Sequence, residues 1–182
     1  MDLDAVFALN TLTRDVPFLD KLMVALSSPV LGFGLLGVFA LFLVNRKRPG
    51  WLVLLALGGA VGASDGLCHH VIKKWIERTR PCMTEPALYT PAGCGTGFSM
   101  PSIHAANAFA AALVLTLFIP RAAAPAYLLA IAIAMSRIFL GVHYPSDVFA
   151  GAVIGTVIGL AFALPAHRWV QDRQKKWFER TT

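Results

Sequence analysis

Charged side chains are scarce in this chain. They make up 14% of its 182 residues, whereas a soluble domain usually carries about 25%. Hydrophobic residues make up 57% of the chain, and they gather in long runs. The shortage of charge and the distribution of apolar residues exclude an ordinary soluble domain. They indicate an integral membrane protein.

Several other features are missing. The three cysteines are few and odd in number, which is not the pattern of a disulfide framework. No internal repeat, low-complexity tract or linker marks a second domain. The N-terminus is acidic and no basic segment precedes an apolar core, so we expect no signal peptide. These absences predict a single membrane domain over residues 1–182.

Five apolar runs come near the ~20 residues that a helix needs to cross a bilayer. They cover residues 30–44, 51–71, 103–119, 122–140 and 148–166. Glycine and alanine recur within them, which suits close helix packing in lipid. We therefore predict an all-α fold, an integral membrane bundle of about five transmembrane helices.

The first fifteen residues have a different pattern. Four apolar side chains fall roughly on one helical face, namely Leu3, Val6, Phe7 and Leu12. The charged side chains of this segment lie elsewhere around the helix. We therefore expect an interfacial amphipathic helix over residues 1–15.

The basic residues indicate how the chain is oriented. The net charge of +6 comes from lysines and arginines at the ends of apolar runs. This placement argues against a nucleic-acid partner and fits anionic lipid headgroups or phosphate substrates. Five crossings would place nine of the 16 lysines and arginines on the side of the tail, residues 168–182. The positive-inside rule then puts the tail in the cytoplasm of an inner-membrane protein, and the opposite face toward the periplasm or exterior.

Three polar segments interrupt the apolar pattern, and all three fall on that outer face. They are KKWIERTRP at residues 73–81, MPSIH at 100–104 and SRIFLGVHYPSD at 136–147. Charge in or near hydrocarbon is costly and marks a candidate functional site. The segments supply cations, two histidines and the carboxylate of Asp147, and the cations and histidines are Lys73, Lys74, Arg78, Arg80, Arg137, His104 and His143. Such a set suits a phosphate, because cations neutralise its oxygens and histidines transfer protons or attack near neutral pH.

The spacing within these segments indicates separate roles. Ser102 stands at the start of a predicted helix, where unpaired backbone amides bind anions. Pro145 starts the last helix and places Asp147 in its first turn, four residues after His143. The carboxylate can then accept from one ring nitrogen of His143 and leave the other free to attack, as an orienting group does in nucleophilic catalysis.

Together the motifs resemble the three-part signature of the type 2 phosphatidic acid phosphatase (PAP2) superfamily. The matching pattern is Lys73-x6-Arg80-Pro81, then Pro101-Ser102-x-His104, then Ser136-Arg137-x5-His143-x3-Asp147. The order of the motifs and their places at helix ends also fit. The resemblance covers residues 73–147 by motif and the whole chain by membrane layout. It implies a membrane lipid phosphatase that needs no metal or other cofactor.

The resemblance also implies a role for each matching residue. His143 would be the nucleophile that forms a phosphohistidine, and Asp147 would hold its ring. His104 would protonate the leaving oxygen and then activate water. The phosphoryl oxygens would be bound by Lys73, Arg80, Ser102 and Arg137. The sequence departs from the family pattern at Ile103, where a small residue is usual, and a stiff β-branched side chain there bears on substrate fit or rate.

Residues beside the motifs receive separate interpretations. Lys74 and Arg78 are interpreted as interfacial charges near lipid headgroups. Ser136 is expected to help position Arg137 or His143. A polar stripe at four-residue intervals is formed by Asp65, His69 and Lys73. The stripe is either a buried relay that supports Lys73 or a set of polar groups that satisfy one another. No metal site is expected.

One cysteine lies in a predicted membrane crossing, and the other two lie in the long loop. Cys68 lies inside the second crossing and is expected to be a small buried hydrophobe. Cys82 and Cys94 lie in the long loop, residues 73–101, which the topology places in an oxidising compartment where paired thiols join. They are either two free thiols or a disulfide, and we predict the disulfide. The bridge would fix the path between Arg80 and His104.

Three functions are compatible with this sequence. The first is hydrolysis of a lipid phosphate or diphosphate presented by the membrane, with isoprenoid diphosphate or phosphatidylglycerophosphate favoured and lipid A as an alternative. The second is phosphate transfer between lipids through the same histidine intermediate. The third is a non-catalytic lipid transporter, which the presence of both histidines disfavours. No oligomeric state is predicted.

Overall fold

The computed structural model describes residues 2–30, 32, 34 and 50–181 of the chain. Over these residues it is all-helical, as predicted. The elements are α1 (Asp2–Asp15), α2 (Pro17–Ser27), α4 (Gly50–Gly66), the π-helix η1 (Leu67–Ile72), α5 (Lys73–Ile76), α6 (Pro81–Thr84), α7 (Ile103–Phe118), the 3₁₀ helix η2 (Pro120–Ala122), α8 (Ala123–Phe139) and α9 (Pro145–Thr181). The predicted crossing at residues 30–44 falls mostly outside the described residues.

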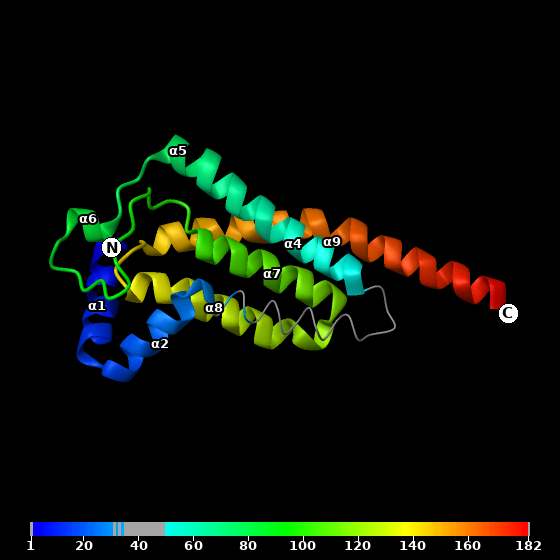
Figure 1. Cartoon of the computed structure of the whole chain (residues 1–182), viewed down its shortest axis with the longest axis horizontal. Coiled ribbons are helices and arrows are strands. Elements are labelled where there is room, and N and C mark those ends of the chain that lie inside the picture. Colours follow the sequence, from blue (N-terminus) through cyan, green and yellow to red (C-terminus); the bar gives the residue numbers. More distant parts are fainter. Residues whose placement is uncertain (1, 31, 33, 35–49, 182) are drawn as a thin grey trace.

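Among the described residues, the long helices α4, α7, α8 and α9 form a bundle in which α7 is central. Helix α7 packs against α4, α8 and α9, and these helices run along the long axis of the molecule (Figure 1). Among the described residues, three segments are long and apolar enough to cross a membrane, namely Gly50–Thr84, Pro120–Phe139 and Pro145–Arg173. Helix α7 is apolar but shorter, with 16 residues. The predicted run at 51–71 corresponds to α4 and η1, the run at 103–119 to α7, the run at 122–140 to the end of η2 and α8, and the run at 148–166 to α9.

Helix α9 continues beyond the predicted crossing. It runs from Pro145 to Thr181, passes through Pro165 without ending, and projects past the rest of the bundle (Figure 1). The segment expected as a tail, residues 168–182, is therefore helical up to Thr181. An apolar run indicates how much of a helix lipid can cover, but it does not locate the end of the helix.

Small residues allow α9 to lie directly on the backbone of α7. A Cβ atom added to Gly151 would lie 2.3 Å from the carbonyl oxygen of Ser102, and one added to Gly155 would lie 2.0 Å from that of Ala106. Glycine at these positions lets the two backbones approach closely, as in other membrane helix pairs. The close approach brings the first turn of α9 to the start of α7, where the Ser102 amide donates to the Asp147 carbonyl at 3.0 Å.

Helix α1 forms where an amphipathic helix was expected, but its buried face differs from the expected one. That face carries Val6, Asn10 and Thr13, whereas Leu12 is exposed. The Asn10 side chain donates to the carbonyls of Tyr89 and Phe139 and accepts from the Tyr89 amide. Polar contacts with the protein therefore select the face, and α1 packs against the same end of the bundle as the long loop.

The loop between α5 and α7 is cross-linked. A disulfide joins Cys82 and Cys94, as predicted, and Cys68 is a buried free thiol. The Ser99 amide donates to the Arg78 carbonyl at 2.7 Å, so the end of the loop lies beside its beginning. The loop closes over the bundle end at which α4 finishes and α7 begins.

Candidate active site

The three polar segments meet at this end of the bundle, and His143 lies at their centre. It belongs to the turn between α8 and α9, and its side chain is 2% exposed. The turn passes through Gly141 at φ +69°, a conformation that glycine adopts without a steric penalty. The amides of Val142 and His143 then donate to the carbonyl of Arg137, each at 3.2 Å. The backbone thus holds His143 close to the end of α8.

Asp147 orients the ring of His143. Its Oδ2 atom lies 3.4 Å from Nδ1 of His143 and also accepts from the Tyr144 amide at 2.8 Å and from the Ser99 hydroxyl. An ionised Asp147 can only accept, so this network assigns the proton of the neutral ring to Nδ1. The lone pair is then on Nε2, which faces the guanidinium of Arg80 at 3.4 Å.

Arg78 supplies the counter-charge for this carboxylate. Its guanidinium donates to Oδ1 of Asp147 at 2.7 Å, to the Ser146 hydroxyl at 2.6 Å and to Asp2 at 3.1 Å. It also lies over the ring of Tyr144, 4.0 Å from the centroid. The interpretation of Arg78 as an interfacial charge is therefore wrong. The family motif does not mark this arginine, and its partners Asp2 and Asp147 lie too far away in the sequence to reveal it.

Burial keeps His143 uncharged. The ring lies between the spanning segments, and loss of solvent lowers its pKa well below the ordinary value of about 6.5. The hydrogen bond to Asp147 acts in the opposite direction, whereas the nearby charges of Arg80, Arg137 and Lys73 lower the pKa further. The unprotonated form, which can attack phosphorus, is thus the stable form at neutral pH.

Two of the expected phosphate ligands are anchored by loop carbonyls. Lys73 is buried at the end of the π-helix η1, and its ammonium donates to the carbonyls of Phe98 and Ser99. Arg80 donates from Nε to the Gly97 carbonyl at 2.7 Å and from a terminal nitrogen to the Val142 carbonyl at 3.1 Å. An ammonium has three donors and a guanidinium five, so both cations retain donors for an anion.

The other two expected ligands carry buried donors with no partner among the described residues. These donors are the hydroxyl of Ser102 and Nε of Arg137. Ser102 is the N-cap of α7, yet its hydroxyl does not cap the helix. Buried polar groups are normally paired, and those left unpaired call for an explanation such as an absent ligand. Each of these donors is available to an oxygen of an anion.

His104 and Arg137 are joined through the last residue of α2. The carbonyl of Ser27 lies 3.2 Å from Nε2 of His104, and the hydroxyl of the same serine accepts from the Arg137 guanidinium. One residue thus presents two oxygens to two of the groups expected to contact a phosphate ester. Sequence reasoning missed Ser27, which belongs to none of the three motifs.

The supporting residues behave differently from expectation. The Ser136 hydroxyl donates to the Ile133 carbonyl of its own helix at 2.7 Å, rather than to Arg137 or His143. Asp65 accepts from Asn107, and His69 is exposed with its ring edge-on to that of His70. The relay to Lys73 is not formed among the described residues, because the π-helix η1 interrupts the four-residue register of α4.

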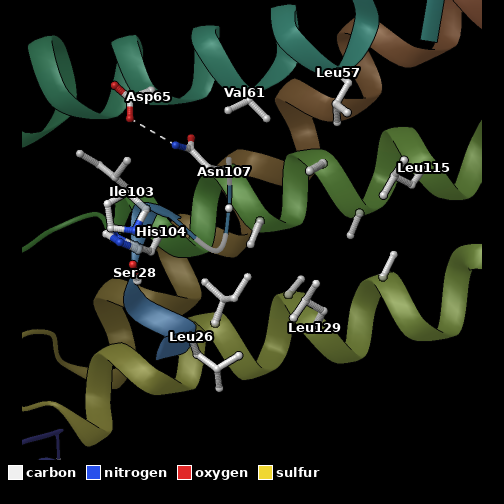
Figure 2. A pocket seen from close by; sticks show the side chains of 18 residues that line it. Leu26, Ser28, Leu57, Val61, Asp65, Ile103, His104, Asn107, Leu115 and Leu129 are labelled. Atoms are coloured by element: carbon white, nitrogen blue, oxygen red, sulfur yellow. Dashed lines mark hydrogen bonds between the residues drawn. The ribbon is translucent and has the colours of Figure 1, made fainter. Parts of the chain in front are cut away.

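A cavity of about 410 Å³ extends from this site between α4, α7 and α8 (Figure 2). His104 lines it at one end, and most of the other lining side chains are aliphatic. Ile103, the departure from the motif pattern, also lines this cavity. Its side chain therefore contributes to the apolar wall, where it bears on which substrate fits.

Comparison with known proteins agrees with this geometry. The family model described as the PAP2 superfamily matches residues 49–175. The chain is 31% identical to the lipid A 4′-phosphatase of Bacteroides thetaiotaomicron over 163 residues, which is 84% of this chain and 72% of that protein. It is 37% identical to the decaprenylphosphoryl-5-phosphoribose phosphatase of Mycolicibacterium smegmatis over 150 residues, covering 72% and 80% of the two chains.

The fold has a counterpart among solved structures. It superposes on the crystal structure of a transmembrane PAP2-type phosphatidylglycerolphosphate phosphatase from Bacillus subtilis with a TM-score of 0.65 and 25% identity. The match covers 96% of this chain and 85% of that one. The chain therefore belongs to the PAP2 superfamily and is a multi-pass membrane phosphatase.

Proposed function

We propose that this protein hydrolyses a lipid phosphate ester through a phosphohistidine on His143. The observation that carries the proposal is the neutral, oriented ring of His143, with Nδ1 directed to Asp147 and Nε2 facing the guanidinium of Arg80. A nucleophile held by a third group and directed at a cation is suited to attack on a bound phosphoryl group. Both histidines are present, which favours an enzyme over a transporter.

In the first step, Nε2 of His143 attacks phosphorus and the bond from phosphorus to the leaving oxygen breaks. His104 gives its proton to that oxygen, so the lipid leaves as a neutral alcohol. The Nδ1 proton of His143 stays directed at Asp147, whose charge stabilises the ring while it carries the phosphoryl group. Lys73, Arg80 and Arg137 offset the charge that develops on the phosphoryl oxygens.

In the second step, water attacks phosphorus and His104 takes the proton that the water gives up. The bond between phosphorus and Nε2 breaks, so His143 returns to its neutral form and inorganic phosphate is released. All charge compensation in this scheme comes from side chains. We therefore propose that no metal ion takes part.

A membrane lipid is the proposed substrate class. The relatives named above are phosphatases of lipid A, of decaprenylphosphoryl-5-phosphoribose and of phosphatidylglycerolphosphate. An apolar cavity that begins at His104 is compatible with substrates of this kind. From the sequence we favour an isoprenoid diphosphate or phosphatidylglycerophosphate, acted on at the outer face of the inner membrane with the C-terminus in the cytoplasm. The Cys82–Cys94 bridge supports an oxidising compartment for the site.

The test is release of inorganic phosphate by the purified protein in detergent, with phosphatidylglycerophosphate and farnesyl diphosphate as substrates. We expect release without an added lipid acceptor, no loss of rate in EDTA, and inhibition by vanadate, which mimics five-coordinate phosphorus. Transfer of the phosphoryl group to a second lipid supplied as acceptor, with no release of inorganic phosphate, would instead identify a phosphotransferase. Strict dependence on added Mg²⁺ would contradict the histidine mechanism.

A further inference from the structure

Two polar side chains face each other at the cavity beside His104. Asn107 lies three residues after His104 in α7 and thus on the same side of the helix. Its Nδ2 donates to Oδ1 of Asp65, from α4, at 3.2 Å, and both residues line the cavity (Figure 2). The Oδ1 atom of Asn107 is buried and has no hydrogen-bond partner among the described residues.

The hydrogen bond within this pair joins α4 to α7, but it leaves the Asn107 carbonyl oxygen unpaired. Asp65 and Asn107 stand among aliphatic neighbours that include Val61, Ala108 and Ala111. Asp65 is an exposed residue that lines the cavity, and a carboxylate in a membrane-spanning segment is costly and marks a candidate functional position. A buried carbonyl oxygen without a donor is costly as well. Both costs would be offset by a ligand that donates hydrogen bonds to the pair.

We infer that Asp65 and Asn107 recognise a hydroxyl group on the leaving alcohol of the substrate. The inference rests on the proposed function, because it places the leaving oxygen at His104. The carbon skeleton beyond that oxygen enters the cavity that His104 lines, and Asn107 lies one helical turn farther along α7. A hydroxyl near the ester oxygen would donate to Oδ1 of Asn107 or to the carboxylate of Asp65.

The chemistry of the pair selects an uncharged donor. The free positions on Asp65 and on the Asn107 carbonyl are acceptors, so a phosphate bonded directly to the leaving oxygen, as in a lipid diphosphate, would be repelled by the carboxylate. An ammonium group would meet the positive charges of Lys73, Arg80 and Arg137 at the same end of the bundle. The site therefore favours phosphate monoesters of hydroxyl-bearing lipid alcohols over lipid diphosphates.

The experiment compares substrates within one enzyme preparation. The probes are phosphatidylglycerophosphate, its analogue without the hydroxyl on the terminal glycerol, and farnesyl diphosphate. Because kcat/KM ratios between substrates are independent of the amount of active enzyme, a partly folded variant still gives a valid ratio. For the unaltered protein we expect the hydroxyl-bearing lipid to exceed its deoxy analogue by about 10-fold or more, as expected for a lost hydrogen bond to a charged group.

Two variants test the assignment, and one serves as a control. Asp65→Asn should reduce the preference for the hydroxyl and raise the relative rate on farnesyl diphosphate, because the repelling charge is gone. Asn107→Leu should abolish the preference for the hydroxyl. Glu77→Gln removes the same charge from an exposed position outside the cavity and should leave both ratios unchanged.

The outcomes separate this inference from the proposed function. Equal rates on the hydroxyl-bearing and deoxy lipids, with ratios unaltered in Asp65→Asn and Asn107→Leu, would overturn the inference while the phosphatase activity stands. A preference that changes equally in Glu77→Gln would also overturn it, because a general effect of surface charge would then be responsible. If none of the three lipids releases phosphate, the proposed function itself is overturned.

Discussion

The two sides of α7 differ in how they are packed and in what they carry. Toward α9, the backbones touch through Gly151 and Gly155, and the polar network of Asp147 is closed by hydrogen bonds. Toward α4 and α8, the side chains leave a cavity of about 410 Å³ with an unpaired amide oxygen on Asn107. The packed side is suited to fixed chemistry, whereas the hollow side is suited to selecting among lipids.

His104 lies where these two sides meet. Its side chain lines the cavity and lies within hydrogen-bond distance of the Ser27 carbonyl. The Ser27 hydroxyl in turn accepts a hydrogen bond from Arg137. In the proposed mechanism, His104 at this boundary would serve a phosphoryl group on the packed side and a leaving alcohol on the hollow side. The division predicts that substitutions on the packed side change turnover or folding, while those on the hollow side change substrate preference.

The largest effect is expected from His143→Ala. Loss of the nucleophile should lower kcat by about 10²- to 10⁴-fold or more, with normal membrane insertion. The matched control is His70→Ala, which removes an exposed histidine and should retain the unaltered rate. Phosphate release from detergent-solubilised lipid measures both. Unaltered turnover in His143→Ala would end the nucleophile assignment.

Glycine substitutions test the packing difference itself. Alanine at Gly155 would place its Cβ 2.0 Å from the Ala106 carbonyl oxygen, whereas a Cβ at Gly62 in α4 meets nothing within 4 Å. We expect Gly155→Ala to lower stability by about 1–3 kcal/mol or more. Gly62→Ala should be neutral or stabilising by up to about 1 kcal/mol. Thermal unfolding in detergent gives the comparison, and equal midpoints would show that the α7–α9 contact is looser than described.

Arg78→Ala tests the counter-charge of the network. The buried carboxylate of Asp147 would lose a charged hydrogen bond, which typically stabilises by about 1.5–3 kcal/mol, and the ring of His143 would lose part of its support. We expect lower stability and about 10-fold slower turnover, by the same loss of one charged hydrogen bond. Lys74→Ala removes a neighbouring exposed cation as a control. If the two variants behave alike, Arg78 is only an interfacial charge.

The smallest expected effect is in the pH dependence of the first chemical step. In the proposed mechanism, His143 attacks in its neutral form. Its pKa is lowered by burial, so phosphohistidine formation should continue below pH ~6.5, the ordinary histidine value. The lowered pKa of His143 also stabilises the folded protein above about pH 6.5, the ordinary histidine pKa. This stabilisation is lost progressively as the pH falls below about 6.5, because the unfolded chain then binds a proton that the folded chain does not. Single-turnover rates at a series of pH values measure the step. A rate that already falls above pH 6.5 with protonation of His143 would contradict the burial argument.

The sequence predicted the packed side of α7 better than the hollow side. Motif spacing identified His143 and Asp147 because four residues across a helix start determine their geometry. The disulfide was predictable because Cys82 and Cys94 share one loop. Both pairs of residues are close in the sequence, and the first pair also belongs to the family motif.

Other features depend on contacts between residues that lie far apart in the sequence. Arg78 reaches Asp2, and His104 reaches Ser27, and no periodicity in either segment indicates these pairs. The polar stripe from Asp65 to Lys73, interpreted either as a relay or as groups that satisfy one another, assumed a regular α-helix, which the π-helix η1 interrupts. A cavity has no sequence signal of its own, since its lining comes from several helices.

Chemical identification of the covalent intermediate tests the central claim most directly. The protein would be mixed with lipid substrate labelled in the phosphate that is released, quenched in alkali within one turnover, digested and examined by mass spectrometry. The account predicts a phosphoryl group on His143 that is stable in alkali and lost in acid, and that is missing from His143→Ala. A phosphoryl group on another residue, or steady turnover in a variant that forms no phosphohistidine, would contradict it.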